Sequence, residues 1–372
     1  MTAPAFSSSI MRALTLHQSN EEGWRPGSVW HPTKLEELPV PTPDEDQVRV
    51  KVLASGFNHR DVFQRQSLYP GTILSTPSTP SILGADAVGL VLSPSSHPLY
   101  QRRVLLCPTV GWLSSPLGPD VPSQPWGILG SVKQTGGRGT FAEYVCVGKE
   151  DVVLCPEHLG KDEAAVVPLG GLTAYRAVFT KAGVKEGDNV LITGIGGGVA
   201  ILALQFCVAA GANVWVSSSS EEKIKRAVEL GATGGVNYKD PSWPKLLPTL
   251  LPSSRPYLDA VIDSGGGPIA NQVARVIKDG GIVACYGQTS GKAVEVGMSF
   301  VLKNAEMKGS TMGSRDEFFK AIAFIAKHKI QPVIDTVLDG LDKAEEGFEL
   351  LKKGGQFGKV VITIAKDEQS KL

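Results

Sequence analysis

The sequence has few cysteines and no excess of charge of either sign. Its five cysteines are scattered and odd in number, and no two of them form a C-x-x-C pair. This pattern argues against a disulfide framework and against a cysteine-rich zinc lobe. The 37 basic and 37 acidic residues balance, so nothing indicates a nucleic-acid partner or a membrane surface. The first residues, MTAPAFSSSIMRALTL, also lack the basic segment and apolar core of a secretory signal.

Glycine and proline, by contrast, are abundant, at 42 and 25 residues of 372. Because 42% of the residues are still apolar, this composition indicates a loop-rich α/β protein and not a disordered chain. The length suits about two domains, each large enough for a core of its own.

One long stretch, residues 190–220, carries no charged residue. A membrane-spanning helix is one interpretation of such a run. Four glycines in its first third and β-formers at both ends favour a buried strand–turn–helix–strand unit instead. The spacing that fits a phosphate-binding turn is Gly194, Gly197 and Ala200, since Val199 occupies the place of the third glycine. Such a turn lets backbone N–H groups approach a pyrophosphate at the start of the next helix.

The expected elements divide the chain into two domains. Residues 11–108 are rich in β-formers separated by Pro/Ser/Gly loops, and residues 109–137 form a long turn-rich loop of a kind that is usually functional. Further along, strands alternate with helices. We expect strands at 11–17, 48–55, 85–92, 103–107, 141–147, 190–193, 213–217, 235–237, 258–263, 281–286 and 358–364, and helices at 161–182, 221–230, 271–278, 314–327 and 342–353. The predicted domains are residues 1–160 with 330–372, and residues 161–329, the second being a doubly wound parallel sheet.

The second strand of the uncharged unit ends in four serines, 217–220, and Lys223 follows. An acidic residue at the strand end would hold the 2′-hydroxyl of a nicotinamide dinucleotide and repel a 2′-phosphate, and none is present. We therefore predict NADPH over NADH, with Ser218 and Lys223 near the 2′-phosphate. In the alternative, Ser220 caps a helix with a solvated first turn, and both interpretations can hold together.

Several short motifs then occur in a fixed order along nearly the whole chain. They are G-F-N-H-R-D at 56–61, L-Y-P-G at 68–71, L-G-A-D-A-V-G at 83–89, G-T-F-A-E-Y at 139–144, G-L-T-A-Y at 171–175, G-A-T at 231–233 and F-G-K at 357–359. With the glycine turn, they resemble the medium-chain dehydrogenase/reductase superfamily, in particular its zinc-independent quinone oxidoreductase and enoyl reductase branch. The resemblance implies a GroES-like β-barrel domain with a Rossmann domain inserted before its last segment.

The departures from the zinc alcohol dehydrogenases are informative. The resemblance places Asn58 where those enzymes carry their first catalytic cysteine, and Ala85 where they carry a histidine ligand. His59 and Asp86 remain as candidate ligands without a third, whereas an open catalytic zinc site needs about three. We therefore predict an enzyme that works without zinc.

Without a metal, the protein must polarise its substrate by hydrogen bonds and supply a proton after hydride arrives. Tyr69 stands where the resembling enoyl reductases carry a tyrosine proposed as proton donor, and Asn58 is the candidate second hydrogen-bond donor. In the alternative, Tyr69 packs in its loop and water protonates the product. We interpret His59 as a structural histidine hydrogen-bonded to backbone, with a proton relay as the alternative. Arg60 and Asp61 are interpreted as an ion pair that fixes the loop.

The resemblance also implies which residues bind the cofactor. They are Thr173 and Gly287 near the nicotinamide, Gly194, Gly197 and Gly198 at the pyrophosphate, Ser218 and Lys223 at the 2′-phosphate, Tyr238 beside the adenosine ribose, and Lys359 over the cofactor from the C-terminal segment. The alternatives are that Tyr238 is a plain surface residue and that Lys359 is a solvated strand end.

Three functions remain open at this point. The first is an NADPH-dependent, zinc-free reductase of a quinone or of the C=C bond of an enone or enoyl thioester; the others are a zinc alcohol dehydrogenase and a non-catalytic NADPH-binding protein. The final Ser-Lys-Leu, 370–372, matches the address read by a peroxisomal import receptor, and favours acyl or lipid-derived carbonyl substrates. The cytoplasm is the alternative location. Relatives pair through the edge of the Rossmann sheet, so we expect a homodimer.

Overall fold

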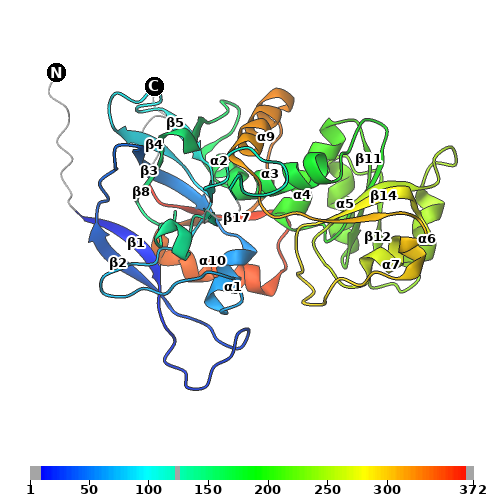
Figure 1. Cartoon of the computed structure of the whole chain (residues 1–372), viewed down its shortest axis with the longest axis horizontal. Helices are drawn as coiled ribbons and strands as arrows, with labels where there is room; N and C mark the ends of the chain where they lie inside the picture. Colours follow the sequence, from blue (N-terminus) through cyan, green and yellow to red (C-terminus); the bar gives the residue numbers. More distant parts are fainter. Residues whose placement is uncertain (1–9, 122–125, 366–372) are drawn as a thin grey trace. The chain divides into compact units, whose positions relative to one another are not determined.

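The computed structural model describes residues 10–121 and 126–365, and Figure 1 shows the whole chain. The chain divides into two compact units. Unit 1 comprises the chain up to Leu169, residues 314–322 and the chain from Ile334 onward, whereas unit 2 comprises residues 170–313 and 323–333. The Ser-Lys-Leu end predicted as a peroxisomal address lies outside the described residues.

Unit 1 is built on a sheet whose strands come from distant parts of the chain. β3 (Gln47–Gly56) lies between β4 (Val88–Ser93) and the C-terminal β17 (Lys359–Thr363), and is antiparallel to both. The same sheet contains β5 (Arg103–Leu106), β8 (Tyr144–Gly148), β9 (Val152–Leu154) and β16 (Ile334–Asp339). Two small antiparallel pairs join β1 (Ile10–Leu16) to β2 (Thr33–Pro39) and β6 (Thr109–Val110) to β7 (Gly127–Ile128). The pairing of β17 with β3 brings Lys359 next to the segment that follows β3.

Aromatic side chains fill the core of unit 1 where its short helices meet the sheet. The ring of Phe57 lies 4.7 Å from that of Phe141 and 5.2 Å from that of Phe348, in the C-terminal helix α10 (Ala344–Lys353). Helix α1 (His59–Arg65) directly follows Phe57 and packs against α10. The helix α2 (Lys161–Ala165) completes this layer.

Unit 2 is a parallel sheet in the order β12-β11-β10-β13-β14-β15. Its strands are β10 (Asn189–Ile192), β11 (Asn213–Ser218), β12 (Gly234–Asn237), β13 (Leu258–Asp263), β14 (Ile277–Cys285) and β15 (Glu306–Gly309). The connecting helices are α4 (Gly198–Ala209), α5 (Glu221–Glu229), α6 (Trp243–Leu250), α7 (Ile269–Val273) and α8 (Met298–Val301). Successive strands run outward from β10 to one side and then from β13 to the other, which is the doubly wound arrangement.

The uncharged stretch forms the centre of this sheet. Every residue of β10 and β13 is buried, as expected of parallel strands that helices cover on both faces. Apart from Gln205, helix α4 is apolar around its circumference because it packs within the protein, so the strand–turn–helix–strand interpretation is confirmed. In residues 10–121 and 126–365, no helix combines the length and apolarity needed to cross a bilayer.

Several elements differ from the sequence expectation. The helix expected at 271–278 ends at Val273, because Ile277 already pairs with Leu258 in the sheet. Strands β2, β9, β15 and β16 are absent from the expectation, since they are short or carry charged side chains on exposed faces. The expected helix 161–182 is α2 followed by α3 (Val167–Tyr175) and a π-helical turn, Arg176–Lys181. The helix expected at 314–327 is α9 (Arg315–His328).

Candidate active site

The glycine turn of unit 2 lies where a dinucleotide site is expected. The strand order reverses between β10 and β13, and ligands of doubly wound sheets bind at this switch point, beyond the carboxyl ends of the strands. The chain leaves β10 through Gly194, at φ +65°, and Gly196, at φ +130°, conformations that favour glycine. Gly197 then caps α4, and a Cβ there would have no neighbour closer than 4.0 Å. The turn therefore leaves room for a pyrophosphate at the start of α4.

A buried carboxylate, which the sequence analysis missed, organises the neighbouring strand end. Asp263 accepts a hydrogen bond of 2.6 Å from the Thr193 hydroxyl and one of 2.8 Å from the Gly266 N–H. The Ser264 N–H in turn donates to the Thr193 hydroxyl at 3.1 Å. A signal was available, because D-S-G-G-G directly follows a buried strand, and a carboxylate there can order a glycine turn.

The predicted nicotinamide residues lie in the same unit. A Cβ at Gly287 would come 3.1 Å from the Ser264 carbonyl oxygen, so this strand end approaches the Asp263 turn closely. The Thr289 N–H and hydroxyl both donate to that carbonyl, at 3.0 Å, and hold the two loops together. The Thr173 hydroxyl donates to the Met312 sulfur at 3.7 Å.

The residues predicted for the 2′-phosphate gather at the ends of β11 and β12. The Ser220 hydroxyl accepts a hydrogen bond from the Lys223 N–H, so its predicted role as helix cap is confirmed. Ser218 is buried, and its hydroxyl accepts a hydrogen bond from the Ser220 N–H at 3.2 Å. The Tyr238 N–H donates to the Ser218 carbonyl at 2.9 Å, while its side chain is 49% exposed. Two acids, Glu221 and Glu222, lie in the first turn of α5, and Glu221 accepts a hydrogen bond from Asn237.

In unit 1, three predicted polar residues form one buried cluster. The Lys359 ammonium donates to Asn58 Oδ1 at 2.6 Å, to Asp86 Oδ2 at 2.9 Å and to the Phe57 carbonyl at 2.8 Å. The Lys359 side chain is only 7% exposed and that of Asp86 is fully buried. All three N–H groups of the ammonium are therefore used inside unit 1, so Lys359 is not a solvated strand end.

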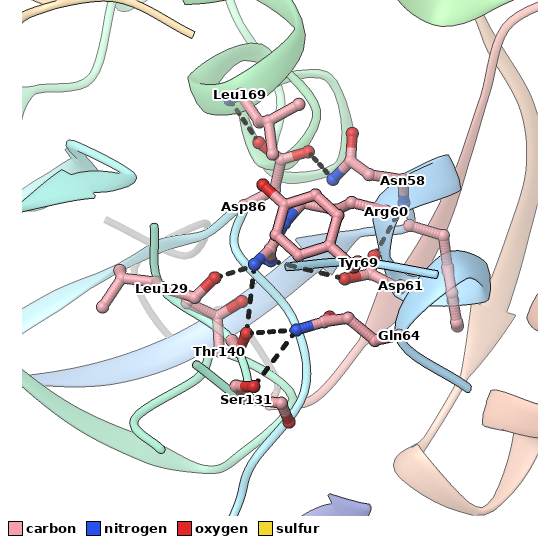
Figure 2. Close-up of polar contacts among 12 residues, drawn as sticks. Asn58, Arg60, Asp61, Gln64, Tyr69, Asp86, Leu129, Ser131, Thr140 and Leu169 are labelled. Atoms are coloured by element: carbon pink, nitrogen blue, oxygen red, sulfur yellow. Dashed lines mark hydrogen bonds and ion pairs between the residues drawn. The ribbon is translucent and has the colours of Figure 1, made fainter. Parts of the chain in front are cut away.

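The same cluster fixes the amide of Asn58. Its nitrogen donates to Asp86 Oδ2 at 2.9 Å and to the Gly56 carbonyl at 3.2 Å, which engages both of its N–H groups. The other Asp86 oxygen accepts a hydrogen bond of 2.5 Å from the Leu169 N–H. Figure 2 shows Asp86 between Leu169 and Asn58. Asn58 is thus oriented by its neighbours, and it would donate to a substrate only in exchange for one of these bonds.

Helix α1 presents a polar face that holds the loop of residues 129–131. Arg60 donates to the carbonyls of Leu129 and Gly130 at 2.7 and 3.1 Å, and Gln64 donates to the Gly130 carbonyl at 2.7 Å. Arg60 also lies 3.7 Å from Asp61, so the predicted ion pair is confirmed. Full burial raises the pKa of the Asp61 carboxyl to about 6, although the Arg60 charge and the Asn58 N–H oppose the shift.

Tyr69 lies in the loop after α1, with its ring against Arg60. The guanidinium carbon is 4.7 Å from the ring centroid, and Figure 2 shows the ring in front of the Arg60 side chain. The loop itself is closed by a hydrogen bond from the Thr72 hydroxyl to the Tyr69 carbonyl. Tyr69 is half-buried, and no described residue bonds to its hydroxyl. The Tyr69 ring is therefore held by Arg60, while its hydroxyl makes no hydrogen bond to any described residue.

His59 differs from its predicted role. No described residue hydrogen-bonds its ring, so the expected bond to backbone is wrong, and the side chain remains exposed at the start of α1. Partial loss of water around the ring, followed by the Lys359 charge, lowers the pKa of the imidazole below its ordinary value. His59 is therefore neutral at neutral pH.

The long loop 109–137 is partly folded on itself. The ring of Trp112 lies 5.5 Å from that of Trp126, and Trp112 and Leu129 are buried, whereas Leu113 is exposed. Residues 122–125 lie outside the described part of the chain.

The residues present do not fit a catalytic zinc ion. In the parts of the chain that the structure describes, no three His, Cys, Asp or Glu side chains are grouped to hold a metal. At the position that the resemblance assigns to the metal, Asn58 and Asp86 instead bind the ammonium of Lys359. A zinc ion, with two positive charges, would be repelled by the ammonium at this position, so these residues do not fit zinc catalysis.

Comparison with known proteins agrees with this architecture. Two family models match, an alcohol dehydrogenase GroES-like domain over residues 44–157 and a zinc-binding dehydrogenase over residues 198–327. The zinc-type alcohol dehydrogenase-like protein YogA of Leptosphaeria maculans is 44% identical, over 94% of this chain and 99% of that protein. The 2-methylene-furan-3-one reductase of Solanum lycopersicum is 30% identical, over 88% of this chain and 75% of that protein.

A solved structure extends the likeness to three dimensions. An NAD-dependent alcohol dehydrogenase superposes with a TM-score of 0.82 at 32% identity, covering 95% of this chain and 100% of that chain. The predicted fold class, a GroES-like domain with a doubly wound parallel sheet, is thereby confirmed. The fold, the order of the motifs and the matches along nearly the whole sequence together show the family. The chain belongs to the medium-chain dehydrogenase/reductase superfamily and is an oxidoreductase of that type.

Proposed function

We propose that the protein is an NADPH-dependent reductase that uses no zinc and acts on a conjugated carbonyl compound: a quinone, or the C=C bond of an enone or enoyl thioester. The observation that carries this proposal is the ammonium of Lys359 bound to Asn58 and Asp86 at the position assigned to a metal. A zinc alcohol dehydrogenase polarises the oxygen of a plain aldehyde with its metal, and these residues do not supply such a Lewis acid. A conjugated acceptor takes hydride at carbon with hydrogen-bond polarisation alone.

The glycine turn and the ends of β11 and β12 support NADPH as the cofactor. When bound, the nicotinamide supplies the hydride. The α4 N-terminus would hold the pyrophosphate, with Gly194 and Gly197 giving the backbone access to it. Ser218, Lys223 and Tyr238 would surround the 2′-phosphate and its ribose. The NAD-dependent dehydrogenase among the similar structures makes NADH the competing cofactor, and the assay below compares the two.

Unit 1 would supply the groups that act on the acceptor. Tyr69 has the free hydroxyl of a proton donor or a carbonyl-orienting group, and Arg60 fixes its ring. His59, neutral and exposed, is a second candidate to relay a proton. The relative named for a 2-methylene-furan-3-one also supports this chemistry, since such a compound is an alkene conjugated to a ketone.

The second candidate is a zinc-type alcohol dehydrogenase, which the name of the 44%-identical relative favours. It predicts about one zinc per chain and reduction of a plain aldehyde. The third, a non-catalytic NADPH-binding protein, predicts tight cofactor binding without turnover.

Oxidation of NADPH and NADH at equal concentration, followed by absorbance, tests the proposal against an ortho-quinone, a simple enone, a trans-2-enoyl-CoA and a plain aldehyde. We expect turnover with at least one of the first three, none with the aldehyde, and kcat/KM at least tenfold higher with NADPH. Reduction of the aldehyde alone, together with bound zinc, would establish the dehydrogenase interpretation. NADPH binding with no turnover on any acceptor would favour the non-catalytic one.

A further inference from the structure

The cation of the unit 1 cluster is enclosed by the chain itself. Lys359 and Asp86 are separated by 273 positions in sequence, yet their charged atoms lie 2.9 Å apart in a place that water hardly reaches. Burying an ion pair carries a large desolvation penalty. The penalty is offset only where further hydrogen bonds satisfy the remaining donors and acceptors of the pair. Here Asn58, the Phe57 carbonyl and the Leu169 N–H complete it.

The cluster is connected to Tyr69 through helix α1. Lys359 binds Phe57 and Asn58, the two residues immediately before α1, and Asn58 is the N-cap of that helix. The first turn of that helix carries Arg60, whose guanidinium lies on the Tyr69 ring and also donates hydrogen bonds to the backbone at 129–130. The position of the phenol therefore depends on where α1 begins, and Lys359 is one of the groups that hold the residues at that point.

We infer that Lys359 is a positioning residue for Tyr69, its ammonium serving as the fixed cation of unit 1 in place of a metal, and that it is not a ligand of the cofactor. The inference rests on the proposed function for its effect on turnover. It follows from the use of all three ammonium N–H groups inside unit 1, which leaves none for a phosphate. It replaces the expectation from the family resemblance that this lysine closes over NADPH.

Two variants test the inference. Lys359→Met removes the charge at similar length, but it leaves the Asp86 carboxylate buried without a counter-charge and can unfold the protein. The paired variant Lys359→Met/Asp86→Asn keeps the cluster neutral, and the amide oxygen introduced at position 86 can still accept a hydrogen bond from the Leu169 N–H. Lys343→Met, which breaks an exposed ion pair with Glu346 in the same unit, is the matched control.

The measurements are the NADPH dissociation constant by fluorescence, kcat on the best acceptor of the panel, and the solvent deuterium isotope effect on kcat. For the paired variant we expect a dissociation constant within about twofold of the parent and kcat lowered at least tenfold. The isotope effect should rise, because protonation by a misplaced Tyr69 becomes slower; a merely structural change would leave this effect unmoved. The control should match the parent in all three.

Two results would overturn the inference. One is a tenfold weaker affinity for NADPH with kcat unchanged at saturation, which would make Lys359 a cofactor ligand. The other is kcat and isotope effect equal to the parent, which would make the cluster structural only. If the parent itself turns over no acceptor, the proposed function fails, while an unchanged NADPH affinity in the variant still supports the exclusion of Lys359 from the cofactor site.

Discussion

At the scale of single residues, the site of unit 1 is defined by which polar atoms already make hydrogen bonds within the unit. The amide of Asn58 and the ammonium of Lys359 have no N–H left for another partner, whereas the Tyr69 hydroxyl is open in the described structure. The sequence motifs favour Tyr69 and Asn58 together as donors to substrate. The structure gives the two residues different roles, because Asn58 could donate to a substrate only by losing one of the hydrogen bonds that it already makes.

Tyr69→Phe tests the open hydroxyl. Because the ring and its contact with Arg60 stay, we expect kcat to fall by ~10²-fold, the usual contribution of a positioned proton donor. The affinity for NADPH should not change. Stopped-flow and steady-state assays on the best acceptor measure both, with Tyr100→Phe, a half-buried tyrosine elsewhere in unit 1, as control. A decrease of less than twofold would mean that water protonates the product.

At the scale of elements, the turn between β10 and α4 depends on backbone conformations that side chains disfavour. Gly194 has φ +65°, and a Cβ on it would lie 2.7 Å from the Ser264 hydroxyl. The clash would reach the Asp263 network that orders the adjacent strand end. The turn thus couples the conformation of the phosphate-binding loop to that of the loop after β13.

Gly194→Ala should therefore weaken NADPH binding at least tenfold and lower the free energy of unfolding by ~1–3 kcal/mol, since strain and clash add. Gly183→Ala is the matched control, because Gly183 has φ +66° with no atom within 4 Å of its Cβ position. It bears the same backbone strain without the clash. Isothermal titration and urea unfolding compare the two; equal NADPH affinity in both variants would contradict the role of the turn.

At the scale of the whole molecule, the buried charges of unit 1 make stability depend on pH. The pKa of Asp61 is about 6 in the folded protein against 3.8 ordinarily, so the folded state binds this proton more tightly than the unfolded chain. The stabilisation is present below about pH 4 and is lost as the pH rises through 6. The charges around Asp61 are those of Arg60, Lys359 and Asp86.

Asp61→Asn should remove this dependence. An amide oxygen can still accept from the Asn58 N–H, and the amide does not titrate, so the difference in unfolding free energy between variant and parent should grow by about 2 kcal/mol from pH 4 to pH 7. Denaturant unfolding at several pH values measures it, with the exposed Asp46→Asn as control for net charge. A difference that stays constant with pH would refute the raised pKa.

The sequence by itself determined the features that depend on neighbouring residues. The strand–glycine–helix unit, the alternation of strands and helices in unit 2 and the Ser220 cap are all local patterns, set by backbone freedom and hydrophobic periodicity. The short strands at the sheet edges and helix α1 were not predicted, because pairing and packing with distant residues stabilise them.

Only the tertiary structure decided what the polar residues of unit 1 do. Lys359 reaches Asn58 and Asp86 because β17 pairs with β3, a contact between positions some three hundred residues apart in the chain. No spacing in the sequence encodes which donors are engaged and which stay open. Hydrogen bonds between distant residues are settled by the packed fold, and they separate the anchored lysine and asparagine from the free hydroxyl of Tyr69.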